Sequence, residues 1–346
     1  MCSLGGVCHH VRVNGTGSGW RTAAVAALAA AVMVACGAPA PAPAPVVDQV
    51  RVNCAAVPSR CGYPDATNTG VPAGSTLVKV PSQRSFAPGW EWSSVYGAIV
   101  TTGPGAVMNG LDVDGGVQIM HPNATLSNSR VTACGGADDG DVVGIRYNTT
   151  GYSGSNATVV HNTLNGSPAG CDHRARSGIR DVFGEAPGVT ATANDISGTG
   201  NGITLEYEGV AADNWIHDLG HIAGDHHSGL SDHGGAKLVV YRHNTVLIYN
   251  TPVPGGGGVS AALTVYADFG PAQNTVLDDN LISGGAYTIF AGSNADDPPA
   301  TNVKVTNNRL VCGDWDYGPV AFYSPLNGNQ FTGNYCDQDL SSITPS

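Results

Sequence analysis

The segment VVHNTL (159–164) contains the motif that decides the fold of this chain. Its asparagine is followed two residues later by a large apolar residue and preceded three residues earlier by another. Small or polar residues stand between them, which is the period-two pattern of a strand with one buried face. The motif recurs at intervals of 20 to 36 residues, in VMNGL (107–111), NSRV (128–131, with Ser129 in the asparagine position), TANDI (192–196), ADNWI (212–216), YRHNTV (241–246), DDNLI (278–282), TNNRL (306–310) and TGNYC (332–336).

A constant motif at variable spacing predicts a solenoid, because insertions at the turns leave the packing of neighbouring coils unchanged. Each coil can bury its apolar face only against its neighbours. We expect the motif asparagines, from Asn109 to Asn334, to stack in a hydrogen-bonded ladder that satisfies the turn backbone.

A second strand is expected in each coil, in segments that share a central apolar residue. The segments are GVQIMHP (116–122), VGIRYN (143–148), SGIRDV (177–182), NGITLEYE (201–208), SGLSDHG (228–234), AALTVYAD (261–268), YTIFAG (287–292) and VAFYSP (320–325). The central residues predicted to point inward are Ile119, Ile145, Ile179, Ile203, Leu230, Leu263, Ile289 and Phe322. The residues that follow them should form rows on the outer surface, about 4.8 Å apart from coil to coil.

These two repeats resemble the right-handed parallel β-helix of the pectate-lyase-like superfamily over residues 75–340. The stretch CGYPDATNTGVP (61–72) also resembles the opening of a group of secreted actinobacterial β-helix proteins. The resemblance implies an all-β fold, a right-handed parallel β-helix of about nine to ten coils. It implies an architecture and not a reaction, since unrelated activities share one fold.

Composition agrees with this fold class. The 346 residues include 48 glycines and 21 prolines and are only 12% charged, which opposes a large helical domain. The net charge of −12 becomes −14 when residues 1–36 are removed, because that segment contains two arginines and no acid. An acidic chain of this kind lacks the basic footprint of a general nucleic-acid binder.

The first 36 residues are expected to be a signal peptide, with a start codon that could be placed too early. The apolar run at 22–35 is too short to span a bilayer, and MVACG (33–37) resembles a lipobox in which Cys36 becomes lipidated. The Pro- and Ala-rich stretch 37–53 is expected to be an extended linker, and 54–346 a single β-helix domain. We therefore expect an extracellular monomer, either secreted or held at the outer face of the membrane through its lipid alone.

Six cysteines remain in the expected mature domain, and an even number outside the cytosol predicts three disulfides. Cys54 and Cys61 are a local pair. The other four lie about one coil apart in two pairs, Cys134 with Cys171 and Cys312 with Cys336.

The outward positions of the second strand carry the candidate site. Arg180, Glu206, His233 and Tyr266 are the predicted catalytic residues, and they should line up with Arg146 along five successive coils. The predicted substrate-binding residues are Arg146, Arg176, His226, His227 and Tyr323. The local excess of arginine on an acidic chain points to an anionic ligand, with local charge compensation as the alternative interpretation.

The segment HSGLS (227–231) resembles the HxDGIQ-like segment of related β-helix proteins, but it lacks the acid beside Gly229. Asp232 or Asp225 could replace that acid. Asp225, Asp139 and Asp141 are also the candidate metal ligands, with Ca²⁺ as the candidate cofactor, and the resemblance to β-helix lyases implies the same ion. A solvated acidic loop is the alternative for 138–141.

Two mechanisms compete for an extracellular polysaccharide substrate. In β-elimination on an acidic polysaccharide, Arg146 or Arg180 would neutralise a uronate carboxylate while His233 or Tyr266 moves the proton, as in a polysaccharide lyase. A glycoside hydrolase needs two carboxylates, such as Glu206 with Asp232, Asp225 or Asp181, although alternation should turn Asp181 and Asp232 inward. A C5-epimerase and a non-catalytic cell-surface glycan-binding protein are the remaining alternatives.

Overall fold

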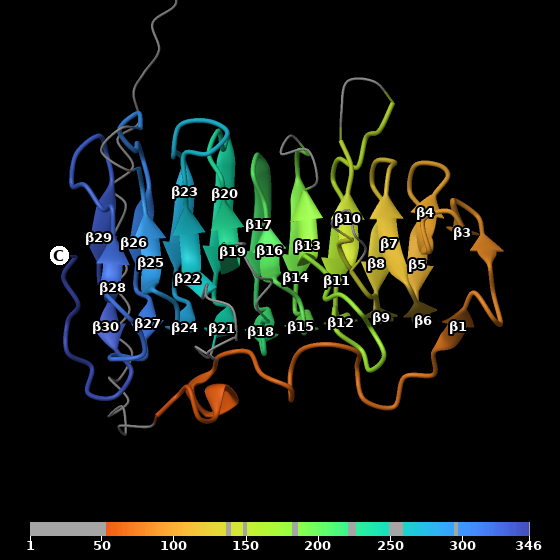
Figure 1. The fold of residues 1–346 in the computed structure, drawn as a ribbon, viewed down its shortest axis with the longest axis horizontal. Helices are drawn as coiled ribbons and strands as arrows, with labels where there is room; N and C mark the ends of the chain where they lie inside the picture. The colour runs from red at the N-terminus through yellow and green to blue at the C-terminus, as the bar shows by residue number, and fades with distance from the viewer. Residues whose placement is uncertain are drawn as a thin grey trace, which may run out of the picture. The chain divides into compact units, whose positions relative to one another are not determined.

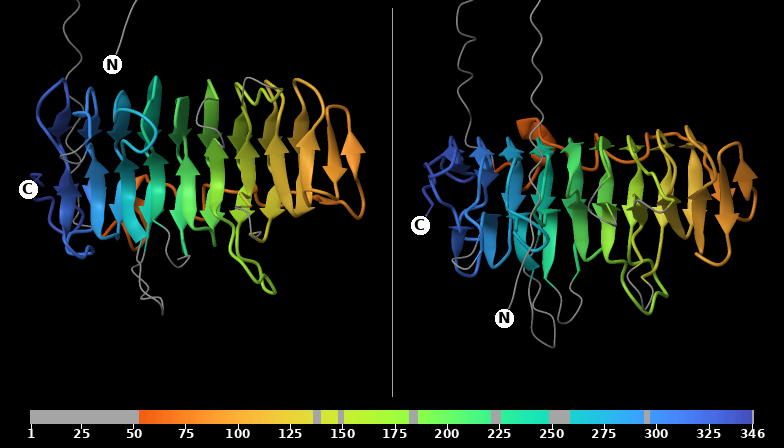
Figure 2. Two further views of the ribbon diagram at one scale, coloured as in Figure 1. Left: turned by 45° about the horizontal axis from the view of Figure 1, so that its top comes forward. Right: turned by 90° about the horizontal axis from the view of Figure 1, so that it is seen from above.

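The structure is a computed structural model that describes residues 53–135, 140–147, 151–181, 186–220, 226–248, 259–293 and 297–345. These residues form a stack of β-strand coils, seen from the side in Figure 1 and from two further directions in Figure 2. The predicted signal peptide, Cys36 and almost all of the linker lie outside the described residues. In the part that is described, no helix is long and apolar enough to cross a membrane.

The strands belong to three sheets, which we call A, B and C, and a short 3-10 helix, η1 (Pro58–Cys61), precedes them. Sheet A contains, in spatial order, β1 (Val78–Val80), β6 (Leu111–Asp114), β9 (Arg130–Thr132), β12 (Thr163–Asn165), β15 (Asp195–Ser197), β18 (Trp215–His217), β21 (Thr245–Leu247), β24 (Leu281–Ser283), β27 (Arg309–Leu310) and β30 (Tyr335–Cys336). Sheet B contains β2 (Phe86–Ala87), β3 (Trp90–Ser93), β4 (Ala98–Thr101), β7 (Gly116–Ile119), β10 (Val143–Ile145), β13 (Ser177–Asp181), β16 (Asn201–Thr204), β19 (His227–Asp232), β22 (Val259–Val265), β25 (Tyr287–Ala291) and β28 (Gly318–Ala321). Sheet C contains β5 (Val107–Asn109), β8 (Thr125–Ser127), β11 (Thr158–Val160), β14 (Val189–Thr192), β17 (Glu208–Ala212), β20 (Leu238–Arg242), β23 (Thr275–Asp278), β26 (Lys304–Thr306) and β29 (Gln330–Thr332).

Each coil passes through sheet C, then sheet A, then sheet B. This order repeats from β5–β6–β7 to β26–β27–β28, and every pairing between these coils is parallel. At one end of sheet B the pairs β2–β3 and β3–β4 are antiparallel. The predicted right-handed parallel β-helix is therefore confirmed, and the ten described strands of sheet A agree with the expected nine to ten coils.

The core consists of the predicted inward rows, with one exception. Ile119, Ile145, Ile179, Ile203, Leu230, Leu263 and Ile289 are fully buried. The prediction for Phe322 is wrong, because Val320 pairs with Ile289 and takes the inward position. Phe322 follows the end of β28 in a left-handed backbone conformation (φ 61°), and its side chain is 43% exposed.

The asparagine ladder is present at the turn from sheet C to sheet A. It consists of Asn162, Asn194, Asn214, Asn244, Asn280, Asn308 and Asn334, all buried. The amide nitrogen of Asn214 donates to Asn244 Oδ1 (2.9 Å) and to the carbonyl of Ala191 (3.0 Å). Asn214 Oδ1 in turn accepts bonds from the backbone and side-chain nitrogens of Asn194 (3.0 and 2.9 Å). Asn214 thus bonds to both neighbouring coils, because its amide nitrogen donates to a carbonyl of the preceding coil and to the amide oxygen of the next.

Asn109 is not part of this ladder, contrary to the sequence prediction. The register pairs Asn109 with Ser127, and Asn109 lies exposed on sheet C, where it accepts a hydrogen bond from Asn128 (2.8 Å). Leu111 occupies the rung position of that coil, and its backbone N–H donates to the hydroxyl of Ser129 (3.0 Å). The ladder therefore ends at Ser129, whose backbone N–H donates to Asn162 Oδ1 (3.0 Å), and the preceding coil has an apolar residue at the rung position.

The segment before β1 runs along the coils, from the C-terminal end of the stack to β1 (Figure 1). The Tyr63 hydroxyl lies 3.1 Å from the Asp279 carboxylate. The Gly70 N–H donates to the Ala193 carbonyl (3.0 Å), and Gly70 has the positive φ of 75° that favours glycine. This segment therefore spans several coils and fastens them along one side.

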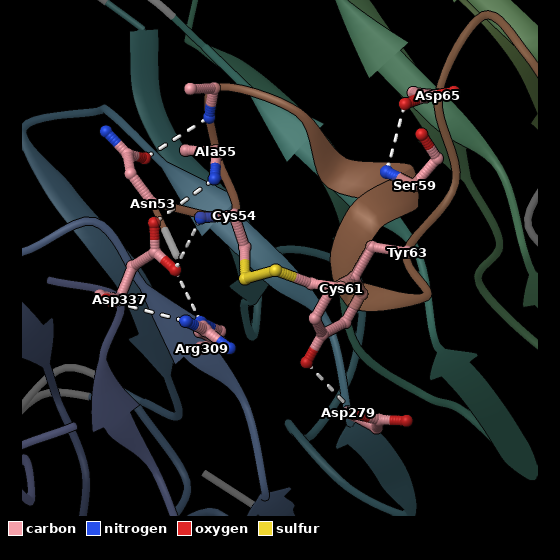
Figure 3. Close-up of a disulfide and its surroundings, with 11 residues drawn as sticks. Asn53, Cys54, Ala55, Ser59, Cys61, Tyr63, Asp65, Asp279, Arg309 and Asp337 are labelled. Atoms are coloured by element: carbon pink, nitrogen blue, oxygen red, sulfur yellow. Dashed lines mark hydrogen bonds and ion pairs between the residues drawn. A yellow bond between two sulfur atoms is a disulfide. The ribbon is translucent and has the colours of Figure 1, made fainter. Parts of the chain in front are cut away.

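The start of that segment is held by a buried charged cluster (Figure 3). The Arg309 guanidinium donates to the Asp337 carboxylate, which also accepts the backbone N–H groups of Cys54 (3.2 Å) and Ala55 (3.1 Å). Cys54 is bonded to Cys61 in a disulfide. The other two predicted disulfides, Cys134–Cys171 and Cys312–Cys336, are also confirmed.

Replacing Asn214 with alanine should lower the free energy of unfolding by roughly 2–4 kcal/mol, because buried groups on two neighbouring coils lose their partners. Chemical denaturation followed by circular dichroism measures this change. Asn109→Ala is the matched control, since Asn109 is exposed and outside the ladder, and it should change stability by less than about 0.5 kcal/mol. Equal destabilisation by the two variants would contradict the register of the ladder.

Candidate functional site

The outer face of sheet B carries the predicted site residues in two neighbouring rows. The register of β7 to β28 places in one row Gln118, Gly144, Arg180, Thr204, Ser231, Thr264, Phe290 and Ala321. Two residues further along the chain, just beyond the strand ends, come Arg146, Glu206, His233 and Tyr266. The five residues expected to line up therefore lie along one sheet, with Arg180 one row apart from the other four.

The sequence placed Arg146 and Arg180 in the same row, and the structure corrects this. Gly144, and not Arg146, pairs with Arg180. The segments VGIRYN and SGIRDV look alike, but Val143 and Ile145 are both fully buried, so either could take the position opposite Ile179. In the observed register Ile145 pairs with Asp181, which fixes Arg146 beyond the end of β10.

Glu206 and His233 form a close pair at the centre of this face. His233 Nδ1 lies 3.1 Å from Glu206 Oε1, and the side chains are 26% and 7% exposed. The contact has the distance of an ion pair, and Glu206 Oε1 accepts no hydrogen bond from the described residues. The arrangement provides a positioned imidazole that solvent and a ligand can reach.

Tyr266 completes a group that we call the Glu–His–Tyr cluster (Glu206, His233 and Tyr266). The ring centroids of His233 and Tyr266 are 6.0 Å apart. Burial raises the pKa of Tyr266 to about 12, even though contacts with the hydroxyls of Ser260 and Ser228 oppose the shift. Tyr266 therefore keeps its phenolic proton at neutral pH.

Asp181 and Asp232 point into the solenoid, as the alternation of the strands predicted. They are 1% and 0% exposed. Asp232 accepts hydrogen bonds from the Thr275 hydroxyl and from the backbone N–H of Gly234 (2.9 Å). Burial raises the pKa of Asp232 to about 7, against the opposing effect of these bonds. Neither carboxylate can reach a polysaccharide on the outer surface.

The other end of the face is positively charged. Arg146, Arg176 and Arg180, which we call the arginine group, all lie close enough to Asp141 to act on it electrostatically. Burial raises the pKa of Asp141 to about 6, although the positive charges of Arg180, Arg176 and Arg146 oppose the shift. Arg146 Nε donates to Gln118 Oε1 (2.6 Å).

Beside the arginine group the surface is hollowed into a groove of about 730 Å³, lined in part by Gln118, Asp141 and Arg146. A groove with convergent polar groups and a buried carboxyl is the expected form of a binding site. The arginine group is arranged to attract an anion, because a guanidinium donates hydrogen bonds in a fork that matches a carboxylate.

The predicted metal site is not supported by these surroundings. Asp139 and Asp225 lie outside the described residues. Asp141 faces three guanidinium groups, whose charge repels a cation. Over the described ranges no group of three or more His, Cys, Asp or Glu side chains could hold a metal ion. The residues present do not fit Ca²⁺ here, and we derive no step through it.

Two predicted substrate-binding residues are placed away from the surface. His227 is fully buried at the start of β19, where its ring lies over Gly200, whose missing Cβ leaves the space. Tyr323 is partly buried and packs against the core and the Phe331 ring (5.5 Å between centroids). His226 is exposed, with Nδ1 3.1 Å from the Ser260 hydroxyl.

Sequence reasoning missed a polar cluster on sheet A. His217 lies between Asp195 (Nε2 to Oδ1, 2.9 Å) and Asp218 (Nδ1 to Oδ2, 2.6 Å), and Trp215 stacks on it with a centroid distance of 3.6 Å. Although burial lowers the pKa of His217, the two carboxylates raise it above its ordinary value. The pairing of Asp195 with Trp215 in adjacent coils was the available signal. Gly70 of the segment before β1 packs against Asp195. This cluster therefore helps to hold that segment against the coils.

Comparisons with known proteins give one weak likeness. No protein-family model matches the chain, and no curated protein matches it. Among solved structures, it is similar to the catalytic unit of a thermostable GH87 alpha-1,3-glucanase from Streptomyces thermodiastaticus, with 12% sequence identity and a TM-score of 0.39. The likeness covers 70% of this chain and 51% of that one, so the chain spans about half the length of that structure. A similarity at this level carries no information about the reaction.

Asp232 should make the protein less stable as the pH rises. Because the pKa of its carboxyl is raised from the ordinary 3.8 to about 7, the folded state binds this proton more tightly than the unfolded state. The associated stability is present at low pH and is lost as the pH passes through 7. Between pH 3.8 and about 7, we expect Asp232→Asn to reduce the loss of unfolding free energy by roughly 2–4 kcal/mol.

Urea denaturation at a series of pH values measures this effect. Asp316→Asn, which changes an exposed aspartate, is the control and should leave the pH dependence of wild type unchanged. If Asp232→Asn follows the wild-type curve throughout, the proton attributed to Asp232 lies elsewhere.

Proposed function

We propose that this chain is an exported carbohydrate-active protein that cleaves an acidic polysaccharide by β-elimination on the outer face of sheet B. One observation carries the proposal: this face brings the arginine group and the Glu–His–Tyr cluster together along successive strands. The three disulfides support an extracellular location. Export through residues 1–36, with Cys36 as a lipid anchor, and action as a monomer are parts of the same proposal.

The arginine group would bind the carboxylate of a uronic acid residue. Neutralising this carboxylate makes the neighbouring C5–H acidic, because the negative charge that develops in the transition state is then stabilised. Arg180 is suited to this role, since it lies in the outward row and forms no salt bridge with another described residue. Arg146 and Arg176 would hold the same sugar from the groove side.

His233 would then remove the C5 proton. The electron pair of the C–H bond forms the C4=C5 double bond, and the C4–O glycosidic bond breaks. Glu206 contacts Nδ1, which leaves Nε2 to accept the proton and stabilises the imidazolium that forms. Tyr266, whose pKa is about 12, would donate its proton to the departing oxygen.

A glycoside hydrolase is the weaker proposal. It needs two accessible carboxylates across the scissile bond, and Asp181 and Asp232 are both buried. Asp225, the third candidate partner of Glu206, lies outside the described residues. A C5-epimerase shares the first proton transfer with the lyase and would differ by returning a proton without breaking the chain.

The proposal predicts that the purified protein releases unsaturated products from a uronic-acid polysaccharide, detected by their ultraviolet absorbance. Arg180→Ala should lower kcat/KM by about 100- to 1,000-fold, because it removes a charge that stabilises the transition state. Arg130→Ala is the matched control. Arg130 is an exposed arginine on sheet A beside Asp112, and its loss should leave the rate unchanged.

The remaining outcomes separate the alternatives. New reducing ends without ultraviolet absorbance would indicate hydrolysis, and a change in uronate stereochemistry without cleavage would indicate epimerisation. Binding without any product would indicate a glycan-binding module.

Tyr266→Phe tests the proton donor separately. The substitution removes the phenolic O–H and keeps the ring, so kcat should fall by about 100-fold while KM changes little. Steady-state kinetics on the same polysaccharide measure both constants. An unchanged kcat would exclude Tyr266 as the acid of the reaction.

A further inference from the structure

The outer face of sheet B continues beyond His233 as a series of aromatic side chains. We call this series the aromatic strip, which consists of Tyr266, Phe269, Tyr287, Phe290, Tyr317 and Phe322. Together with His233, its rings form one connected set. The contacts, given as distances between ring centroids, are His233–Phe269 (5.8 Å), Tyr266–Phe290 (5.4 Å), Phe290–Phe322 (5.3 Å), Tyr287–Phe290 (5.4 Å) and Tyr287–Tyr317 (5.7 Å).

Three of these rings are exposed, and Tyr266, Tyr287 and Phe290 are half-buried. Phe269 and Tyr317 are each 74% exposed, and Phe322 is 43% exposed. Soluble proteins rarely expose a contiguous apolar patch without using it for binding. The exposed arrangement also has a conformational cost, because Phe322 adopts a positive φ that a bulky residue disfavours.

The strands that carry the strip contain no lysine or arginine. After Arg242 the chain contains only two basic residues, Lys304 and Arg309. Lys304 belongs to β26 of sheet C, and Arg309 is buried in β27 of sheet A. Strands β22, β25 and β28 of sheet B therefore offer no cation to a carboxylate. Exposed aspartates adjoin the strip instead, namely Asp268 beside Phe269 and Asp316 beside Tyr317.

We propose that the aromatic strip binds uncharged pyranose residues of the polysaccharide through their apolar C–H faces. This inference rests on the proposed function, whose substrate it narrows. The polymer lies along the axis of the solenoid, with a uronate at the arginine group and neutral sugars over the strip. The substrate is then a mixed polymer of acidic and neutral sugars, and a homopolymer of uronic acids is disfavoured because the aspartates repel it.

Continuity with the Glu–His–Tyr cluster favours a sugar over other occupants. His233 contacts Glu206 on one side and Phe269 on the other, and Tyr266 belongs to both groups. A ligand that reaches the imidazole therefore meets the strip without a break. Aromatic rings in this offset and tilted arrangement present faces and edges on which a saturated ring can pack.

The test compares binding of three polymers to the full-length protein: polygalacturonate, hyaluronan (alternating glucuronate and N-acetylglucosamine) and a neutral β-glucan. Titration calorimetry at the same ionic strength gives each affinity. We expect hyaluronan to bind more tightly than polygalacturonate, and the double variant Tyr317→Ala/Phe322→Ala to weaken hyaluronan binding by about 10- to 100-fold. Phe86→Ala is the matched control, because Phe86 is 73% exposed on β2 and outside the strip.

Tighter binding of polygalacturonate, absence of hyaluronan binding, or wild-type affinity in the double variant would overturn the inference. Sedimentation that shows a dimer of the wild-type protein and a monomer of the double variant would also overturn the inference. The strip would then bind a second copy of the chain. The melting temperature of the double variant should equal that of the wild type, which excludes loss of the fold.

Binding and turnover fail separately in this design. If the double variant loses affinity and no polymer is cleaved, the strip binds sugar and the proposed reaction is wrong. If uronate polymers are cleaved equally by both proteins, the reaction stands and the strip has no part in it.

Discussion

The buried asparagine ladder is the interaction on which the rest of this structure depends. The amide nitrogen of Asn214 donates to a backbone carbonyl in the preceding coil and to an amide oxygen in the next coil, so its position cannot shift by one residue without leaving buried polar groups unpaired. The ladder fixes where the strands of sheet A from β12 to β30 begin. Chain insertions are then confined to the turns, because the strands must keep their parallel register to fill the apolar interior. The rows on sheet B are preserved for the same reason.

The sequence predicted the ladder, the three disulfides and most of the inward residues, since each leaves a mark at a constant offset. It failed where two apolar residues competed for one position. Val143 and Ile145 both fit the interior, as do Val320 and Phe322 by composition alone, and only pairing with a neighbouring coil decides between them. The prediction that Asn109 belongs to the ladder was wrong for a different reason. Asn109 is exposed, but with Gly110 beside it the local sequence resembles that of a ladder asparagine.

The candidate site was predictable in part for the same reasons. Alternation along the strand correctly turned Asp181 and Asp232 inward. The burial of His227 could not be read from its position in a histidine-rich segment, because it depends on the space above Gly200 in the neighbouring coil. The contact between His233 and Glu206 arises from residues 27 positions apart, which only the stacking of coils brings together.

A division of charge along one sheet gives the outer face of sheet B its direction. The arginine group occupies one end, the Glu–His–Tyr cluster the middle, and a face without cations the other end. An acidic polysaccharide bound along this face would place its carboxylate against the arginine group. Its apolar sugar faces would pack on the rings of the aromatic strip.

A crystal structure of the Tyr266→Phe variant with a bound uronate-containing oligosaccharide shows directly whether the outer face of sheet B binds the substrate. We expect a uronate carboxylate within hydrogen-bonding distance of Arg180 or Arg146, with C5 facing His233 and the sugar chain following the strands of sheet B. An oligosaccharide bound on sheet A or sheet C, or one whose carboxylate points away from the arginine group, would contradict this expectation.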